Sequence, residues 1–529
     1  MSISTSLPQT EPAYPPEPPL GRSTRRRNRF GRRGWIAAGL TLLVLLISVG
    51  AYLAYQNTLP TTVTTNFKNG QKDVPTDSRV VLDFSRPVAM AAVQAAFSIT
   101  PTTDGSISSV SGDTHFAWTP KKPLAELTSY TVAMKPIYDI GHHRVSAATW
   151  TFTTIIVPRI TSVSGPGGAP LTAGAEIDPG ATLTLNFNDQ MEPATINVTI
   201  GTQTANLKWA ADDRSATLST AGILAGPITL SMAPGGRDQS GHLVPSAFAL
   251  NTGIYYHDTE HTTALKYPAL IQIPNDPGAW DQNGLQGADI VFEYLAEGGI
   301  TRLTAVFDNA PDLIGPMRSS RFISLKLGRH YKGLLFQSGE SQATRAQAAQ
   351  DPTPQFFDTI GYQFRTSSRY APDNLMIKGP VVLAAEQNYF SSIPAFTIPK
   401  ARPTVSGGAE STFNVAEHYS TYKYDPVTGT YQKSEQGHPY SDASLRQPLR
   451  MSMVVTLHTR ESLLNIGDGH GSYIHDYDLD TGGAIDVYYL GQHYTGTWAS
   501  TDSHGPLTFA VNGQPLTLPP GLVWIDVTQ

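Results

Sequence analysis

Residues 288–321, which read ADIVFEYLAEGGITRLTAVFDNAPDLIGPMRSSR, combine two apolar runs with a dense set of charged side chains. The runs Ile290–Leu295 and Leu303–Phe307 are predicted to be buried strands, with turns at Gly298-Gly299 and Gly315-Pro316. The charged residues between and after them are Glu293, Glu297, Arg302, Arg318 and Arg321. Core strands do not need this density of charge at their ends, whereas sites that bind anions do. The stretch is therefore the leading candidate for a functional site.

Glu293 lies inside a predicted strand, with Phe292 and Tyr294 directed to the opposite face. If the face of Glu293 is buried, its carboxylate must be paired, because an isolated buried charge is costly. Arg302, across the Gly-Gly-Ile turn, is the nearest candidate partner in the sequence. An internal Glu–Arg network that stabilises the domain is therefore the main alternative to a ligand site.

Arg318 and Arg321 are three residues apart at the start of Ser319–Leu327, which is predicted to be a helix. Both arginines would then lie near the helix N-terminus on roughly one face. Backbone donors, the helix dipole and two guanidinium groups would converge there on an anion. Ser319 and Ser320 could cap the helix or bind the same ligand.

Catalysis has weaker support in the sequence. Ser338 lacks the G-x-S-x-G spacing of a hydrolase and is predicted to lie in a polar turn after the strand Gly333–Phe336. Glu293 and Glu297 could form an acid–base pair, but the required separation of two such carboxyl groups does not follow from sequence. The histidines His330, His438 and His493 lack metal-ligand spacing, and the acids of 476–480 lack the glycine and terminal glutamate of an EF-hand. We therefore assign no catalytic residue, expect no metal or cofactor, and leave open whether the protein is an enzyme.

The composition favours several β-rich domains. A chain of 529 residues is too long for one core, and roughly 150 residues per domain predicts three or four domains. Only 15% of the residues are charged, while Gly (46) and Pro (40) are abundant, which is typical of strands joined by many turns. The absence of cysteine excludes disulfides, zinc–thiolate sites, a cysteine nucleophile and a lipoprotein anchor on a cysteine.

Trp35–Tyr55 is a run of 21 residues without charge, which as a helix spans about 32 Å, enough to cross a bilayer. Seven arginines lie between Arg22 and Arg33, so the positive-inside rule predicts a cytoplasmic N-terminus and an extracytoplasmic chain after Tyr55. Residues 1–34 are predicted to be a disordered basic tail, and 35–55 a single transmembrane helix. A cleaved signal peptide is the alternative, and binding of anionic lipid by the arginines is a secondary function.

Residues 1–34 carry seven Arg and two Glu, so of the total net charge of −6 the rest of the chain has −11. An acidic extracytoplasmic region is not a general binder of nucleic acid or of anionic polymer, and any anion site in it must be local.

Two segments, 59–155 and 157–255, show short alternating strands separated by turns. The first resembles bacterial Ig-like domains in the motifs of Val80–Val88, Phe97–Pro101, Phe116–Val132 and Trp150–Thr154. Ala181–Met191 in the second segment mirrors the corresponding stretch of the first, which indicates two sandwiches in tandem. A spacer that holds the next domain away from the membrane is favoured over an adhesion module, because no exposed aromatic cluster stands out.

The remainder resembles the YerB-like family, a bacterial envelope domain of uncharacterised function. The N-terminal part (262–402) and the C-terminal part (412–529) carry its motifs in order: Leu285–Phe307, Ile314–Arg321, Gln337–Ser341, Arg369–Leu375, Tyr424–Asp442, Gly491–Trp498 and Val511–Val527. The family usually has His where Asp373 stands. Many members carry a lipid anchor, which this chain replaces with the apolar helix and the Ig-like stalk.

The predicted architecture is multidomain: a transmembrane helix, two all-β Ig-like sandwiches, and an α/β (α+β) YerB-like domain with a β-rich C-terminal part. The residues and the resemblance together predict a ligand-binding set of Glu293, Glu297, Arg302, Arg318, Ser319, Arg321, Ser338, Arg369 and Asn374. Tyr431, Tyr494 and Trp498 are further lining candidates, although core packing explains such residues more often.

Three functions remain open. The favoured one is a membrane-anchored extracytoplasmic protein that binds an anionic or peptide-like envelope ligand, or maintains the envelope. The second is an enzyme acting on anionic wall precursors, by analogy with LytR-type phosphotransferases, for which Asp289 and Asp308 would have to bind metal. The third is a protein–protein scaffold that uses the Ig-like stalk.

Overall fold

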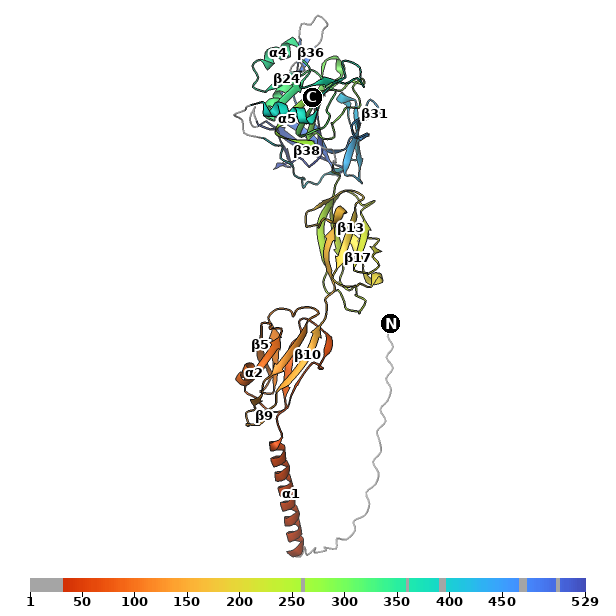
Figure 1. The fold of residues 1–529 in the computed structure, drawn as a ribbon. Helices are drawn as coiled ribbons and strands as arrows, with labels where there is room; N and C mark the ends of the chain where they lie inside the picture. The colour runs from red at the N-terminus through yellow and green to blue at the C-terminus, as the bar shows by residue number, and fades with distance from the viewer. Residues whose placement is uncertain (1–31, 258–261, 358–360, 390–395, 466–472, 501–504) are drawn as a thin grey trace, which may run out of the picture. The chain divides into compact units, whose positions relative to one another are not determined.

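The computed structural model describes residues 32–257, 262–357, 361–389, 396–465, 473–500 and 505–529 (Figure 1). The chain divides into two compact units, one ending at Ile156 and the other comprising Val157–Gln529. Most of the predicted cytoplasmic tail, residues 1–31, lies outside the described residues.

Helix α1 (Arg32–Thr58) has 27 residues and a length of about 40 Å at ~1.5 Å per residue. Its segment Gly39–Gln56 has a mean hydropathy of 1.7, and the rest of the chain buries none of it. By length and composition, this helix can cross a membrane.

The first Ig-like domain packs two antiparallel-rich sheets around one core. One sheet has the order β1 (Val63–Thr65), β3 (Val80–Phe84), β6 (His115–Pro120), β5 (Gly105–Ser111). The other has the order β2 (Gln71–Val74), β10 (Ala148–Thr154), β7 (Ser129–Met134), β4 (Phe97–Thr100). A short helix, α2 (Met90–Ala96), ends directly before β4, because this stretch is rich in alanine, the strongest helix former.

A second sandwich precedes the YerB-like domain and belongs to the second unit. Its sheets are β11 (Ile160–Ser164), β13 (Thr182–Phe187), β17 (Ser215–Ser219), β16 (Lys208–Trp209), and β12 (Glu176–Ile177), β19 (Phe248–Ile254), β18 (Gly226–Met232), β14 (Val198–Ile200), β15 (Gln203–Thr204). Leu183, Leu185 and Leu230 are fully buried between them. The alternation of apolar and polar residues in β13 places its leucines on the inner face.

The YerB-like domain is organised around one large sheet, to which 16 strands of the described residues belong. Its main path runs β24 (Gln355–Phe357), β23 (Leu334–Gln337), β20 (Thr262–Pro274), β22 (Thr301–Pro311), β21 (Ile290–Leu295), β41 (Leu522–Thr528), β34 (Met451–His458), β37 (Gly482–Tyr489), β38 (Gln492–Ala499), β39 (Thr508–Val511), β40 (Gln514–Pro515). The strands β27 (Gly408–Ala409), β28 (Thr412–Val415), β29 (Ser420–Asp425), β30 (Thr430–Glu435) and β31 (His438–Pro439) branch from it.

The two sequence segments of this domain meet at the parallel pair β21 and β41, where Glu293 lies opposite Asp526. Both strands are buried on both faces, as expected of largely apolar strands with one acid each. Val291 and Trp524 belong to one core cluster, whereas Phe292 and Ile525 belong to the cluster on the other face. The N-terminal and C-terminal parts therefore share a continuous sheet and both of its cores.

Three helices in the described residues of the YerB-like domain contact this sheet or one another: α3 (Phe322–His330), α4 (Gln342–Ala348) and α5 (Gly379–Gln387). The helix predicted at Ser319–Leu327 is α3, which begins three residues later than predicted, at Phe322. The remaining predicted strands of this domain are present, β22 being longer than its apolar run at both ends.

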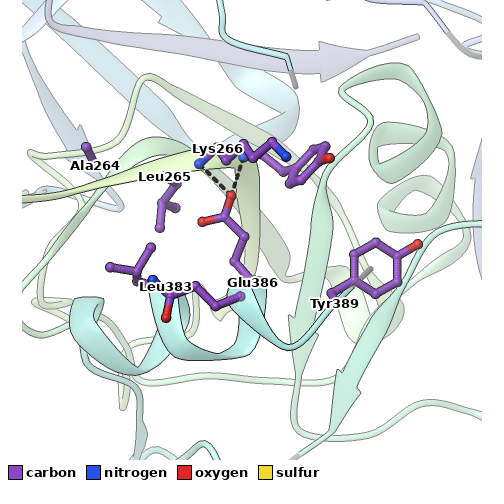
Figure 2. A pocket seen from close by; sticks show the side chains of 8 residues that line it. Ala264, Leu265, Lys266, Leu383, Glu386 and Tyr389 are labelled. Atoms are coloured by element: carbon purple, nitrogen blue, oxygen red, sulfur yellow. Dashed lines mark hydrogen bonds between the residues drawn. The ribbon is translucent and has the colours of Figure 1, made fainter. Parts of the chain in front are cut away.

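Helix α5 packs where β20 is irregular, between Ala264 and Ala269. There the Glu386 carboxylate accepts hydrogen bonds from the backbone N–H groups of Lys266 (2.5 Å) and Tyr267 (2.7 Å), as Figure 2 shows. A surface pocket of about 570 Å³ adjoins this contact. The buried position of Glu386 is explained by these two donors, which the irregular strand leaves without a ladder partner.

Candidate functional site

Glu293 and Arg302, which were predicted to pair, lie on opposite faces of the sheet. In the antiparallel register of β21 and β22, Arg302 faces Tyr294, and Glu293 faces Leu303. Successive side chains of a strand alternate between faces, so Arg302 shares a face with Tyr294 and not with Glu293. The predicted Glu293–Arg302 pair is therefore wrong, and the two residues belong to different environments.

The partner of Glu293 is Lys433 of β30, whose ammonium contacts Glu293 Oε2. Both side chains are fully buried. Trp524 Nε1 donates to the same oxygen at 2.9 Å, while Thr301 donates to Oε1 at 2.9 Å and Asn275 at 3.0 Å. The carboxylate is thus hydrogen-bonded through both oxygens, as burial requires.

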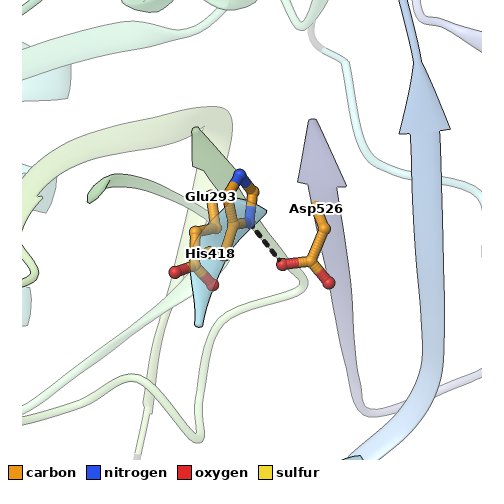
Figure 3. Close-up of side chains that lie close together, drawn as sticks. All are labelled: Glu293, His418 and Asp526. Atoms are coloured by element: carbon orange, nitrogen blue, oxygen red, sulfur yellow. Dashed lines mark hydrogen bonds and ion pairs between the residues drawn. The ribbon is translucent and has the colours of Figure 1, made fainter. Parts of the chain in front are cut away.

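Further charged groups extend this network into the C-terminal part. Lys433 also contacts Glu435 Oε2 at 2.9 Å. His418 Nδ1 lies 2.8 Å from Asp526 Oδ1, and Glu293 lies close to both (Figure 3). We refer to Glu293, His418, Lys433, Glu435 and Asp526 as the buried charge network.

Burial acts to raise the pKa of Glu293, but the Lys433 ammonium outweighs it and holds that pKa below its ordinary value. Burial and the Glu293 charge raise the pKa of Glu435 to about 7, although Lys433 opposes the shift. Burial acts to lower the pKa of His418, yet the hydrogen bond to Asp526 outweighs it, so the net shift is upward. Burial also raises the pKa of Asp526. Glu435 is thus the acid of this network whose pKa lies near neutral pH.

Glu293, His418 and Asp526 present one ligand atom each within 4.8 Å of one another, a grouping that could hold a metal ion. Lys433 already contacts Glu293, and Asp526 already engages His418 Nδ1. A metal would have to displace the ammonium, so the donor set fits the network better than it fits a metal site.

Arg302 lies on the other face and is only 5% exposed. Its Nε and Nη1 are buried and have no hydrogen-bond partner among the described residues. Burial and the neighbouring Arg321 and Arg318 lower the pKa of Arg302 to about 10. The Glu297 carboxylate offsets this effect only in part. A buried guanidinium that has no hydrogen-bonded anion and lies beside two further guanidinium groups is poorly compensated.

Arg321 is fully occupied by the protein. Its Nε and Nη2 contact Glu297 Oε2 at 2.7 and 2.5 Å, and its Nη1 donates to the carbonyl oxygens of Ser319 and Ser320. Arg321 is also the N-cap of α3, where its N–H donates to Ser324 Oγ at 2.9 Å. Glu297 and Arg321, both predicted ligand residues, therefore pair with each other.

Arg318 precedes α3, so the predicted arrangement of Arg318 and Arg321 on one helix face is wrong. Its guanidinium lies 3.4 Å from Asp373 Oδ1 and 4.0 Å from Asp276 Oδ2. Arg318 Nε, Asp373 Oδ1 and Asp276 Oδ2 are nevertheless buried without a hydrogen-bond partner among the described residues. The side chain of Arg318 is 28% exposed, so this part of the cluster reaches solvent.

The serines of the predicted set shape the turn around Arg318. Ser338 N donates to the Arg318 carbonyl at 3.0 Å, and Ser320 N donates to the Gly339 carbonyl at 3.0 Å. Ser319 borders Gly339, where an added Cβ would lie 3.6 Å from its hydroxyl. Ser320, which was predicted as a cap or ligand, is fully buried, and its hydroxyl has no partner in the described part of the chain.

Two predicted residues have other contacts. Arg369 donates to the carbonyl oxygens of Ala279 and Asp281, and so ties the loop before β26 (Leu375–Met376) to the turn after β20. Asn374 accepts from Arg365 at 2.8 Å within the small β25 (Phe364–Arg365) and β26 hairpin. This hydrogen bond does not connect Asn374 to the arginines of the predicted site.

Asp289 and Asp308 lie together at the far end of the β21–β22 hairpin, where Asp289 Oδ2 accepts from Asp308 N at 2.7 Å. Burial and Asp289 raise the pKa of Asp308 to about 6. Lys400 is 3.8 Å from Asp289. Asp308 is six residues from Arg302 along β22, about 20 Å at ~3.3 Å per residue, so this acid pair does not face the arginines.

The remaining candidates have separate surroundings. Tyr431, Tyr494 and Trp498 are all buried in the two cores, as the packing alternative predicts. The acids of 476–480 contact different cations: Lys326 with Asp476 (2.8 Å), Arg460 with Asp478 (3.0 Å) and His330 with Asp480 (3.6 Å). His438 lies 3.0 Å from Asp281, and His493 lies 2.7 Å from Asp486.

The sequence analysis did not identify Lys433, Glu435, His418, Asp526 or Asp276 as site residues. One sequence signal was available. Lys433 and Glu435 are two positions apart in β30, so both charges lie on the same, buried face of the strand. Lys433 is 140 residues from Glu293, so the sequence did not indicate their pairing.

Comparison with known proteins agrees with this architecture. Residues 252–391 match the N-terminal domain, and 410–525 the C-terminal domain, of the family described as Protein of unknown function (DUF3048). Residues 56–154 match the family described as Bacterial Ig-like domain. The chain is thus a YerB-like (DUF3048) protein with a bacterial Ig-like domain before the YerB-like part, which confirms the resemblance found in the sequence.

A relative from Bacillus subtilis (strain 168), named "Putative lipoprotein YerB", is 26% identical over 287 residues, which cover 51% of this chain and 83% of the relative. The crystal structure of YerB protein from Bacillus subtilis is similar at 22% identity and a TM-score of 0.43, over 52% of this chain and 94% of that chain. An L,D-transpeptidase from Mycobacterium smegmatis has 14% identity and a TM-score of 0.16, over 28% of this chain and 65% of that chain.

Proposed function

We propose that the YerB-like domain binds an anionic ligand of the cell envelope at Arg302 and Arg318, and that α1 anchors the domain in the membrane. The observation that supports this function is the buried guanidinium of Arg302, whose Nε and Nη1 lack a hydrogen-bond partner among the described residues. A carboxylate or phosphate accepts hydrogen bonds from guanidinium groups in a geometry that suits both arginines.

The contrast with the other buried cations of the domain strengthens the proposal. Lys433 is paired with Glu293, Arg321 with Glu297, and Lys326 with Asp476. Isolated buried charge costs several kcal/mol, and the folded chain compensates it at each of these positions. Arg302 is where the compensation is missing, and a bound anion would supply it.

Arg318 is the part of the proposed site that a ligand can reach from solvent. Its side chain is 28% exposed, whereas Arg302 is 5% exposed. An anion that reaches Arg318 from solvent comes under the positive potential of Arg302 and Arg321 as well. The role of Arg321 is to hold the turn in place, because its own donors are used by Glu297 and two carbonyl oxygens.

The location outside the membrane rests on α1 and on the arginines before it. The helix is long and apolar enough to cross a bilayer, and the positive-inside rule places the arginine-rich side in the cytoplasm. A relative is named as a lipoprotein, and this chain has no cysteine to carry a lipid. In our proposal α1 supplies the anchor as a single-pass helix, and the Ig-like region is a spacer.

The enzymatic alternative has less support. A phosphotransferase needs metal-binding aspartates beside the arginines, and Asp289 and Asp308 lie about 20 Å away along the strands. The acids near Arg318 are Asp276 and Asp373, which lie within 4.0 Å of its guanidinium. The scaffold alternative leaves the uncompensated charge of Arg302 without a role.

The test is the effect of anions on the urea unfolding of the full chain in detergent, with pyrophosphate and citrate as probes. We expect both anions to stabilise the wild type, and Arg302→Met to remove this effect. Because the variant no longer buries an unpaired charge, its stability without anion should equal or exceed that of the wild type. Arg460→Met, at a side chain that is 81% exposed, is the matched control and should keep the anion effect.

The opposite result is equally clear. If Arg302→Met destabilises the anion-free protein by roughly 3–5 kcal/mol, Arg302 belongs to an internal network and the anion site is rejected.

A further inference from the structure

We infer that the ligand is a zwitterion: Arg302 and Arg318 bind its carboxylate, and Asp276 and Asp373 bind a free ammonium group of the same molecule. This inference rests on the proposed anion site and names the class of ligand that it accepts. An amino acid, or a peptide that keeps a free amine near a carboxylate, carries the required charges.

The two aspartates form the acidic side of the cluster. Asp276 Oδ2 and Asp373 Oδ1 are both buried and lack a hydrogen-bond partner among the described residues. Gly278 lies between them, because a Cβ added there would be 3.2 Å from Asp373 Oδ2 and 3.3 Å from Asp276 Oδ1. The absent side chain at Gly278 leaves the two carboxylates facing a common space.

Arg318 does not satisfy these acids. It lies 3.4 Å from Asp373 Oδ1 and 4.0 Å from Asp276 Oδ2, yet neither oxygen nor the Arg318 Nε forms a hydrogen bond within the described ranges. Burial and the nearby Asp276 raise the pKa of Asp373, in spite of Arg318, Arg302 and Arg369. The cluster therefore contains carboxylate oxygens that accept no hydrogen bond, close to guanidinium nitrogens that donate none.

This combination favours a zwitterion over simple ions. A ligand with negative charge alone still gains at the arginines, but the two carboxylates, which are partly desolvated, weaken its binding. A ligand with positive charge alone meets the reverse problem. An ammonium group has three donors and can bridge two carboxylates, while a carboxylate accepts two hydrogen bonds from a guanidinium. A zwitterion therefore satisfies both halves of the cluster at once.

The side-chain exposures allow such a ligand to enter. Asp276 is 22% exposed, Asp373 14% and Arg318 28%, so each half of the cluster has a part at the surface. Arg302 lies deeper, and its charge acts on the neighbouring Asp373.

The experiment compares three forms of one small ligand by calorimetry on the full chain in detergent: alanylalanine, its N-acetyl derivative and its C-terminal amide, each as the L,L and D,D isomer. We expect the free dipeptide to bind most tightly, and blocking either end to weaken binding by on the order of tenfold or more. Asp373→Asn should bring the free and N-acetylated dipeptides to similar affinity, while Arg302→Met should abolish binding of both.

Two controls keep the result interpretable. Asp113→Asn, at an exposed position of the first Ig-like domain, should leave all three affinities unchanged. Binding of pyrophosphate by Asp373→Asn shows whether that variant is folded, because the substitution keeps the arginines. If Asp373→Asn does not fold, Asp276→Asn replaces it with the same expected result.

The outcomes separate the two proposals. If the N-acetylated dipeptide binds as tightly as the free one, the zwitterion inference is overturned while the anion site stands. The zwitterion inference is also overturned if a folded Asp373→Asn keeps the wild-type preference for the free amine. If neither the dipeptides nor pyrophosphate bind the wild type, both the inference and the proposed function fail.

Discussion

Glu293 and Arg302 lie on opposite faces of the β21–β22 hairpin, although they are only nine positions apart in the sequence. The register that pairs Arg302 with Tyr294 separates them. Glu293 is thereby committed to the buried charge network with the C-terminal part, and Arg302 to the cluster with Arg318 and Arg321. One short hairpin thus supplies a structural charge to one face of the sheet and a candidate ligand-binding charge to the other.

Removing one partner of the Glu293–Lys433 pair should destabilise the domain more than removing both. We expect Lys433→Met to destabilise the YerB-like domain by roughly 3–5 kcal/mol, because it leaves the fully buried Glu293 carboxylate without its cation. The double variant Glu293→Gln with Lys433→Met should recover a large part of this loss. Urea unfolding followed by tryptophan fluorescence gives the coupling energy, and additive single effects would show that the two residues do not interact.

Glu435 should make the stability of the domain depend on pH. Burial raises its pKa to about 7, above the ordinary 4.5, so the folded state holds a proton that the unfolded state has lost. Stability from this group is therefore fully present below about pH 4.5 and declines as pH rises to about 7, with a slope of at most about 1.4 kcal/mol per pH unit. Glu435→Gln should flatten this part of the profile, and the exposed Glu192→Gln should not. An unchanged profile in Glu435→Gln would contradict the assignment.

Arg321 and Arg318 should behave differently when each is replaced by methionine. Arg321 makes hydrogen bonds to Glu297 and to two carbonyl oxygens, so Arg321→Met should cost about 2–3 kcal/mol. Arg318 is 28% exposed and lies near Asp373 and Asp276 without a hydrogen bond through its buried Nε, so Arg318→Met should cost less stability than Arg321→Met and weaken anion binding. Melting temperatures and pyrophosphate titrations of both variants measure the difference. Equal destabilisation would assign the two arginines to one structural network.

Gly315 should be far less replaceable than another glycine with positive φ. Its φ is +135°, and an added Cβ would lie 2.9 Å from the Leu375 carbonyl oxygen and 3.0 Å from Met376 Sδ. Gly513 also has a positive φ (+73°) but has no described atom within 4 Å of such a Cβ. We expect Gly513→Ala to cost about 1 kcal/mol and Gly315→Ala several times as much, with loss of anion binding, because Gly315 positions the turn to Arg318. Thermal unfolding tests this, and similar losses at both glycines would show that contact with the chain around Leu375 is unimportant.

The proposed topology can be tested by labelling, because the chain contains no cysteine of its own. A cysteine at Ser4 should be protected from a membrane-impermeant maleimide in intact cells, and a cysteine at the exposed Ser106 should react. Permeabilised cells should label both positions. Labelling of Ser4→Cys in intact cells would reverse the orientation, and a protein too short to contain it would indicate cleavage.

Much of the fold could be predicted, because local patterns of apolar and polar residues determine the strands and helices. The run of β21, apolar except for Glu293, predicted its bounds and its burial on both faces. The alternation in β13 and β3 predicted sandwich strands with one buried face. Helix α3 was placed too early, because Ser319 and Ser320 resemble a cap, whereas Arg321 takes that position with Ser324.

The sequence by itself determined the apolar helix, the strand-rich domains and the concentration of charge in residues 288–321, because periodicity, length and composition act over short distances. Only the tertiary structure decided which charges are satisfied. Lys433 reaches Glu293 from 140 residues away, and Arg321 takes Glu297, while Arg302 finds no carboxylate among the described residues. The physical reason is that the choice of partner depends on strand register and on contacts between distant segments, and a shift of one residue would move each of these side chains to the other face.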